Sequence, residues 1–265
     1  MKYGEHGPQS GKPEIAKKPA ARPAVLDGRL TGAEGVVDDG CGRYVLQVKA
    51  KDLAKRYNLA KAPDGIRENF NVAPGQTLPV VIEPDEGGRR VEMMRWGLVP
   101  AWAKDLKIGY KLINARDDTI FDKPMWRGVV LKKRALIPAT GFYEWQKPAE
   151  PKARKQPFYI HPKQAGIFSF AGVWSGWADA EGKQWQTYSI ITTEPNKEMS
   201  KVHNRMPVIL DPDDEAAWLD PAKTARRDIE PFLRPYHDGG LEVFRVSDEV
   251  NSPTNNDKHL ISPAA

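Results

Sequence analysis

Alternation of apolar and polar residues is the dominant pattern in this chain. A period of two residues is typical of β-strands that bury one face. It predicts a strand that begins near Cys41, and eight further strands at these ranges: Leu78–Glu83, Val91–Trp96, Arg134–Trp145, Phe158–His161, Ile167–Trp174, Trp185–Thr193, Met206–Leu210 and Leu241–Val246.

Helical spacing of apolar residues is confined to short segments. Lys51–Leu59 carries Leu53, Ala54 and Tyr57 on one face. Four other helices are predicted, at Asp117–Lys132, Asn196–His203, Asp213–Leu219 and Ala225–Leu233. Many strands with few, scattered helices predict an α+β fold: a single domain with a central antiparallel, barrel-like β structure and peripheral helices.

The two ends of the chain lack this periodicity. Residues 1–40 are rich in Gly, Pro, Ala and Lys, which predicts a disordered leader. Residues 41–250 form the predicted folded domain, and the polar residues 251–265 are expected to form a loose tail. Lys147–Lys155 is predicted to be an exposed basic loop between two strands.

Composition narrows the class of protein. Hydrophobic residues make up 40% and charged residues 28% of the chain, which suits a globular core. No apolar stretch is long enough to span a membrane, and no secretory signal is visible. A single cysteine excludes an internal disulfide and a cysteine-rich zinc cluster. We expect a soluble, cytoplasmic protein.

Charge points weakly to a polyanionic partner. The first forty residues hold six basic and six acidic side chains, so the whole net charge of +5 lies in residues 41–265. A modest basic excess favours nucleic acid but does not establish it.

The single cysteine, Cys41, stands where the leader meets the first strand. A free cysteine is usually a small buried hydrophobic residue. Here Gly40 and Gly42 flank it, which predicts an accessible sulfur and backbone. Cys41 is therefore a candidate for a reactive thiol as well as for a core residue.

Three other positions combine polar groups that suit catalysis. Glu144 shares a strand face with Phe142, where desolvation would raise the pKa of its carboxyl toward proton-transfer duty; a surface glutamate is the alternative. His203 precedes Arg205 at a helix-to-strand junction, a pairing that suits an anionic ligand. Asn114 with Arg116 forms a similar pair, unless Asn114 caps a helix.

Aromatic residues and a proline cluster in two short motifs. Trp96 and Trp102 lie in RWGLVPAW and Pro74 lies in NVAPG. Core packing explains most tryptophans, whereas exposed ones beside basic residues would stack on bases. No phosphate loop, dinucleotide fingerprint or metal-ligand spacing occurs, so we predict no cofactor and no metal.

Taken together, eight short motifs resemble the SOS response-associated peptidase (SRAP) family, whose members process abasic sites. They occur in the family's order between Cys41 and about Leu210: CGRY, NFNVAPGQ, RWGLVPAW, INARDDTIF, IPATGFYEW, FAGVW, SIITTEPN and VHNRMPVIL. The resemblance implies a single α+β domain with a barrel-like β structure and a positively charged groove. It also implies a covalent crosslink to an abasic site in single-stranded DNA.

The resemblance assigns roles to residues of this chain. The catalytic set it implies is Cys41, Asn114, Glu144 and His203. The DNA-contacting arginines are Arg43, Arg116 and Arg205, and the motifs that shape the lesion pocket contain Pro74, Trp96 and Trp102. The partner would be single-stranded DNA with abasic sites, bound by a monomer that associates with the nucleoid when on DNA.

One departure from the family limits this chemistry. In the family the cysteine follows the initiator methionine, so that its amine and thiol close a thiazolidine ring on the aldehyde of the abasic sugar. Here forty residues precede Cys41 and its nitrogen is an amide. Cleavage between Gly40 and Cys41 is the favoured explanation. The others are a misassigned start, although residue 40 is not Met, and a variant that binds DNA without the ring.

Two other functions compete with abasic-site capture. A cysteine peptidase acting on other proteins would need only the Cys41 thiol and His203 as its base. A non-catalytic binder of single-stranded DNA would bind intact and abasic strands equally and would not need Cys41.

Overall fold

The computed structural model describes residues 40–150, 153–164 and 166–265, together with Met1. The predicted leader therefore lies outside the described residues, apart from Met1 and Gly40. The predicted basic loop is described only in part. Within it, Arg154 is exposed and lies 3.4 Å from the carboxylate of Asp248.

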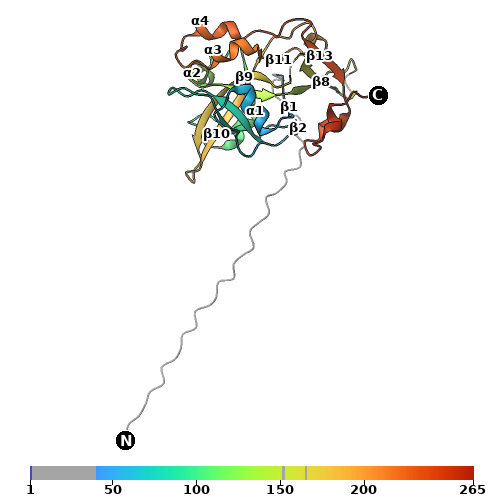
Figure 1. Cartoon of the computed structure of the whole chain (residues 1–265). Coiled ribbons are helices and arrows are strands. Elements are labelled where there is room, and N and C mark those ends of the chain that lie inside the picture. Colours follow the sequence, from blue (N-terminus) through green and yellow to red (C-terminus); the bar gives the residue numbers. More distant parts are fainter. Residues whose placement is uncertain (2–39, 151–152, 165) are drawn as a thin grey trace. The chain divides into compact units, whose positions relative to one another are not determined.

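Five strands close into a β-barrel, in the order β10-β4-β3-β6-β9 and back to β10 (Figure 1). Neighbours are antiparallel except β10 and β4, which run parallel. The strands are β3 (Thr77–Ile82), β4 (Arg90–Trp96), β6 (Arg134–Ala139), β9 (Phe168–Ala178) and β10 (Gln184–Thr193). The predicted α+β fold with a barrel-like β structure is confirmed.

A second, antiparallel sheet has the order β13-β8-β7-β1-β2. Its strands are β1 (Arg43–Leu46), β2 (Asn69–Val72), β7 (Gly141–Gln146), β8 (Gln156–Pro162) and β13 (Leu241–Arg245). Three short strands extend the barrel sheet: β5 (Asn114–Arg116) and β11 (Met206–Pro207) pair with β10, and β12 (Ile209–Leu210) pairs with β9.

A bend at Thr140 connects the two sheets. The sequence predicts one strand over Arg134–Trp145, but the chain turns at Thr140, so β6 joins the barrel and β7 joins the second sheet. The Thr140 hydroxyl donates to the Val45 carbonyl at 3.2 Å, and the Thr140 amide donates to the same carbonyl at 2.8 Å. This clamp fixes the start of β7, the strand that carries Glu144.

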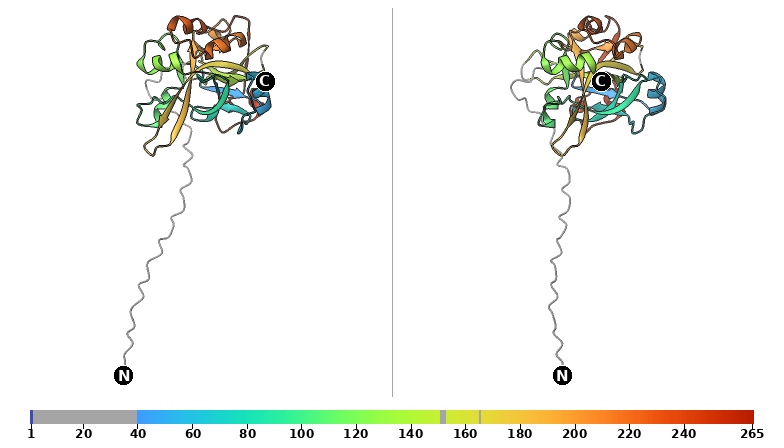
Figure 2. Two further views of the ribbon diagram at one scale, coloured as in Figure 1. Left: turned by 60° about the vertical axis from the view of Figure 1, so that its left-hand side comes forward. Right: turned by 90° about the vertical axis from the view of Figure 1, so that its left-hand side faces the viewer.

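Helices are short and lie outside the barrel. They are α1 (Ala50–Tyr57), α2 (Pro124–Lys132), α3 (Glu215–Leu219) and α4 (Arg226–Ile229). Figures 1 and 2 show α3 and α4 side by side at one end of the domain. The 3-10 helices are Leu106–Lys111, Met199–Lys201, Pro212–Asp214, Glu230–Phe232, Asp248–Asn251 and Lys258–Ile261.

Several predicted element boundaries are wrong. The helix predicted at Asp117–Lys132 begins only at Pro124, whose fixed φ and missing N–H suit a first helical position. The predicted helix Asn196–His203 contains only one 3-10 turn. Strand β2 and the 3-10 helix Leu106–Lys111 were not predicted, because neither shows a clear period.

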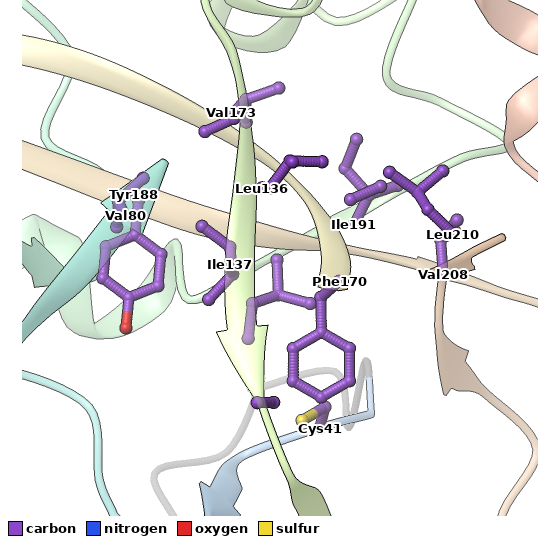
Figure 3. Packing of buried hydrophobic residues seen from close by; sticks show 14 of the residues in the cluster. Cys41, Val80, Leu136, Ile137, Phe170, Val173, Tyr188, Ile191, Val208 and Leu210 are labelled. Atoms are coloured by element: carbon purple, nitrogen blue, oxygen red, sulfur yellow. The ribbon is translucent and has the colours of Figure 1, made fainter. Parts of the chain in front are cut away.

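The barrel interior holds the main apolar cluster. Trp96 is stacked on Tyr188, with ring centroids 6.3 Å apart, and Tyr44 meets Trp96 edge-on at 5.1 Å. Figure 3 shows Cys41 at the edge of this cluster, beside the ring of Phe170. The candidate cysteine therefore closes one end of the core.

The C-terminal residues do not form the loose tail that the sequence predicts. The amide group of Asn71 on β2 donates to the carbonyls of Val250, Ser252 and Asn255 at 3.2, 3.0 and 2.8 Å. Leu260 is fully buried. One asparagine on a strand thus orders a polar segment that has no periodicity of its own.

No helix among the described residues is long and apolar enough to cross a membrane.

Candidate functional site

The side chain of Asn114 binds the backbone at the junction between Gly40 and Cys41. Its amide nitrogen donates to the Gly40 carbonyl at 2.7 Å and to the Cys41 carbonyl at 3.1 Å. Asn114 opens β5, which is held beside β10 by the hydrogen bond from the Ile190 amide to the Ile113 carbonyl at 3.0 Å. Asn114 is therefore a strand residue and not the helix cap that its sequence context allows.

Gly40 is shaped to fit this position. Its φ of +97° lies in the left-handed region that favours glycine. A β-carbon added there would lie only 3.1 Å from the Cβ of Arg205. Both the backbone angle and the space thus require glycine at the residue before Cys41.

Cys41 is fully buried, so the accessible sulfur predicted from its glycine neighbours is wrong. The flanking glycines allow the close packing of the strand end and do not expose it. Its Sγ lies 3.9 Å from the Arg43 carbonyl. Burial, followed by the negative charge of Glu144, raises the pKa of the Cys41 thiol well above its usual value.

Glu144 is 4% exposed, so it is a buried carboxylate on β7 and not the surface glutamate that its sequence context also allows. It stands opposite Phe158 of β8. Because its charge acts on the Cys41 thiol, the carboxylate and the sulfur share one low-dielectric region. A buried carboxylate beside a thiol is suited to moving the thiol proton.

Arg205 lies beside the same junction, on the segment before β11 that also holds His203. The Nδ1 of His203 lies 3.1 Å from the Arg205 amide, which donates to it. The Arg205 guanidinium donates to Asp117 at 2.7 Å and to the Thr192 carbonyl at 2.6 Å. Since the Cβ of Arg205 faces Gly40, this segment forms one wall of the site.

The other two predicted DNA-contacting arginines also have partners within the protein. Arg43 donates to the Asn71 side-chain oxygen at 2.8 Å and to the Val250 carbonyl at 2.9 Å. Arg116 pairs with both carboxylate oxygens of Asp118, at 3.1 and 2.7 Å. Their contact with DNA stays a prediction, and it would require these partners to be exchanged for phosphates.

The three residues expected to shape the lesion pocket differ in exposure. Trp96 is fully buried, stacks on Tyr188 and donates from its indole N–H to the Ile113 carbonyl at 3.0 Å. It is therefore a core residue and cannot stack on a base. Trp102, in contrast, is 67% exposed, and Pro74 is half-buried in the turn after β2.

Two tyrosines were missed by the sequence interpretation. The hydroxyls of Tyr44 and Tyr188 share a hydrogen bond of 2.7 Å, and both interact electrostatically with Cys41. Burial raises the pKa of both phenols. Tyr44 lies in the CGRY motif, but nothing in the sequence pairs it with a residue 144 positions away.

Among the described residues, no group of three or more His, Cys, Asp or Glu side chains is arranged to hold a metal ion.

The buried thiol gives a first prediction. In protein that retains Met1, Cys41 should react with a disulfide-exchange reagent at pH 8 at least about tenfold more slowly than in urea-unfolded protein, because each unit of raised pKa removes nine-tenths of the thiolate. Cys41 is the only cysteine, so the rate at which the reagent is consumed reports this thiol alone. Equal rates in native and unfolded protein would contradict the buried position.

The class of protein is defined by its fold and its site together. The fold is a closed barrel, and the site is a buried cysteine whose backbone carbonyl accepts a hydrogen bond from an asparagine, with a buried glutamate nearby. The model of the SOS response associated peptidase (SRAP) family matches residues 40–253. The chain belongs to this family.

Its relatives agree with this assignment. The chain is 42% identical over 223 residues to the abasic site processing protein YoqW of Bacillus subtilis, covering 83% of this chain and 98% of that protein. It is 31% identical to the abasic site processing protein HMCES of Gallus gallus, covering 84% of this chain and 77% of that protein. A crystal structure of a protein from Bacteroides thetaiotaomicron superimposes with a TM-score of 0.77 at 30% identity, covering 85% of this chain and all of that one.

Proposed function

We propose that this protein captures abasic sites in single-stranded DNA covalently through Cys41, after release of residues 1–40. The observation that carries the proposal is the pair of hydrogen bonds from Asn114 to the Gly40 and Cys41 carbonyls. The charge of Glu144 acts on the thiol at the same junction. The names of the relatives YoqW and HMCES support the substrate class.

Release of the leader follows from the groups around the junction. The Cys41 thiol gives its proton to Glu144 and adds to the Gly40 carbonyl carbon, whose oxygen becomes negative. Asn114 already donates to that oxygen at 2.7 Å, so it stabilises the charge as it develops. The C–N bond then breaks as the nitrogen takes up a proton, which leaves a thioester and a free amine. Water hydrolyses the thioester to a Gly40 carboxylate and the free thiol.

Capture then uses both groups of the new terminal cysteine. An α-amino group has a reference pKa of about 7.7–8.0, so a useful fraction is neutral at physiological pH. The amine condenses with the aldehyde of the opened abasic sugar and water leaves. The thiol adds to the resulting imine carbon and closes a five-membered thiazolidine. Glu144 and His203 exchange protons with the sugar and the amine, and Asn114 orients the cysteine backbone.

The competing functions have less support. A cysteine peptidase acting on foreign proteins needs a thiol that substrates can reach, and Cys41 is fully buried. Non-catalytic DNA binding would not explain why Asn114 donates hydrogen bonds to the Gly40 and Cys41 carbonyls.

Mass spectrometry and a denaturing gel test the proposal together. We expect purified protein to lose residues 1–40, and the product to form a heat-stable adduct with an abasic single-stranded oligonucleotide. The same oligonucleotide without the lesion should give no adduct, nor should protein with Cys41→Ala. An adduct that persists with Cys41→Ala would contradict the proposal, as would the absence of any adduct from protein shown to begin at Cys41.

A further inference from the structure

Arg95 is a buried arginine that pairs with no carboxylate among the described residues. Three arginines are buried in the described part of the chain, and the other two have charged or carbonyl partners within the fold, although the Nε of Arg205 also lacks an acceptor there. Arg134 donates to four backbone carbonyls, and Arg205 pairs with Asp117. Arg95 is 7% exposed, yet its Nη1 finds no acceptor among the described residues, and none of their carboxylates lies within ion-pair distance.

Such an arrangement is unfavourable for folding alone. A buried charge without a partner loses its hydration and gains no compensating bond. Buried polar groups that stay unsatisfied in a native protein are therefore candidates for ligand contacts. The guanidinium suits an anion with several oxygens, because its donors form a rigid fork.

Two glycines border the donors of Arg95. A β-carbon added at Gly75 would lie 3.1 Å from Nη2, and one added at Gly109 would lie 3.3 Å from Nη1. Glycine at both positions lets the backbone approach the guanidinium. The remaining face is covered by the ring of Tyr110, with 4.9 Å between the guanidinium carbon and the ring centroid. Tyr110 itself is 47% exposed.

The covering segment is basic and carries an exposed aromatic residue. Lys104, Lys107 and Lys111 are all exposed on the segment that includes the 3-10 helix Leu106–Lys111. Trp102, also exposed, precedes them. A row of cations with an exposed indole fits a nucleic-acid strand better than a small isolated anion.

Arg95 is connected to the candidate site through its neighbour in the sequence. Its neighbour Trp96 donates to the Ile113 carbonyl, and Ile113 precedes Asn114. The strand of Arg95 and the strand of Asn114 also pair with the same strand, β10, where Arg95 is opposite Thr187 and Asn114 is opposite Ile190.

We propose that Arg95 binds one backbone phosphate of the single-stranded DNA on which this protein acts, with Tyr110 moving aside as the strand binds. The inference rests on the proposed function and adds a positioning contact that no motif indicated.

Salt dependence of binding to an intact strand tests the contact. A lesion-free oligonucleotide excludes covalent capture, and fluorescence anisotropy with the full chain gives the affinity at a series of salt concentrations. For single strands the slope of log K against log salt is about −0.7 per neutralised phosphate. We therefore expect Arg95→Gln to reduce the steepness by about 0.7, and Arg95→Lys to keep the slope while lowering the affinity.

Arg90→Gln is the matched control. Arg90 opens the same strand, is half exposed, and already pairs with Glu92 at 2.8 Å, so its loss changes the net charge equally without removing a phosphate contact. Its slope should equal that of the unchanged protein. Equal slopes for Arg95→Gln and the unchanged protein would overturn the inference, and so would equal losses in both glutamine variants.

Further outcomes separate the possible sources of the anion and guard against misfolding. Thermal stabilisation by inorganic phosphate that Arg95→Gln abolishes, with an unchanged DNA slope, would overturn the DNA assignment in favour of a free anion. If Arg95→Gln does not fold, Arg95→Lys decides: unchanged affinity would overturn the inference. Salt-insensitive binding by the unchanged protein would count against the proposed function itself, whereas normal crosslinking with an unchanged Arg95→Gln slope would count only against the phosphate contact.

Discussion

Asn114→Ala is expected to slow release of residues 1–40 by about 10²–10³-fold, the usual cost of removing one donor from an oxyanion site. The side chain donates to the oxygen that becomes negative when the Gly40 carbonyl is attacked. Because its bond to the Cys41 carbonyl at 3.1 Å is lost as well, the junction should also lose its fixed orientation. Intact mass measured over time after a short expression pulse would show protein that begins at Met1 accumulating.

Asn69→Ala provides the control for this experiment. Asn69 on β2 also uses its amide group in a side-chain hydrogen bond, to Gln76 at 3.0 Å, but it has no bond to the junction. Its variant should process normally. Equal processing by the Asn114 and Asn69 variants would remove the asparagine from the reaction, and leader retention in both would indicate a general folding defect.

Glu144 and Asn114 show how much of the site can be predicted from the sequence alone. Alternation along Phe142–Trp145 places Glu144 on the face of Phe142, but it did not decide between a buried and a surface carboxylate, because Tyr143 on the opposite face is buried as well. The place of Asn114 was not predictable either, since INARDD fits a helix cap as well as a short strand. Only the pairing of β5 with β10, more than seventy residues away, decides between them.

Exposure at the ends of elements was the least predictable feature. Cys41 is flanked by glycines, which indicates local freedom, yet it is fully buried in the same apolar cluster as Phe170 of β9. The C-terminal segment has no apolar period, yet Asn71 holds three of its carbonyls. In both cases the deciding partner is distant in sequence, so neither composition nor periodicity carries the information.

These contacts describe the site while residues 1–40 are attached. The thiol is buried with a raised pKa, its nitrogen is an amide, and the asparagine donates to the Gly40 carbonyl. A buried, protonated thiol is protected from oxidation and alkylation, and in the proposed mechanism this protection lasts until the leader is released.

Trp96→Ala is expected to lower the free energy of unfolding by about 3–5 kcal/mol, the range for removing a large aromatic side chain from a core. The indole is fully buried and stacks on Tyr188, so the variant leaves a cavity, while the Ile113 carbonyl keeps its hydrogen bond from the Ile190 amide. Guanidinium unfolding followed by far-UV circular dichroism measures the loss, which is a large share of the 5–15 kcal/mol typical of a domain.

Trp102→Ala is the natural comparison, because the same residue type in the same motif is 67% exposed. Its effect on stability should stay within about 0.5 kcal/mol. Any effect should appear in the affinity for single-stranded DNA, where an exposed indole stacks on a base for about 1–3 kcal/mol. Similar stability losses in the two variants would contradict the core position of Trp96. We expect a stability loss only for Trp96→Ala and weaker DNA binding only for Trp102→Ala. That result would assign different roles to the two tryptophans of the motif: Trp96 packs in the core and binds the residue before Asn114, and Trp102 contacts the DNA.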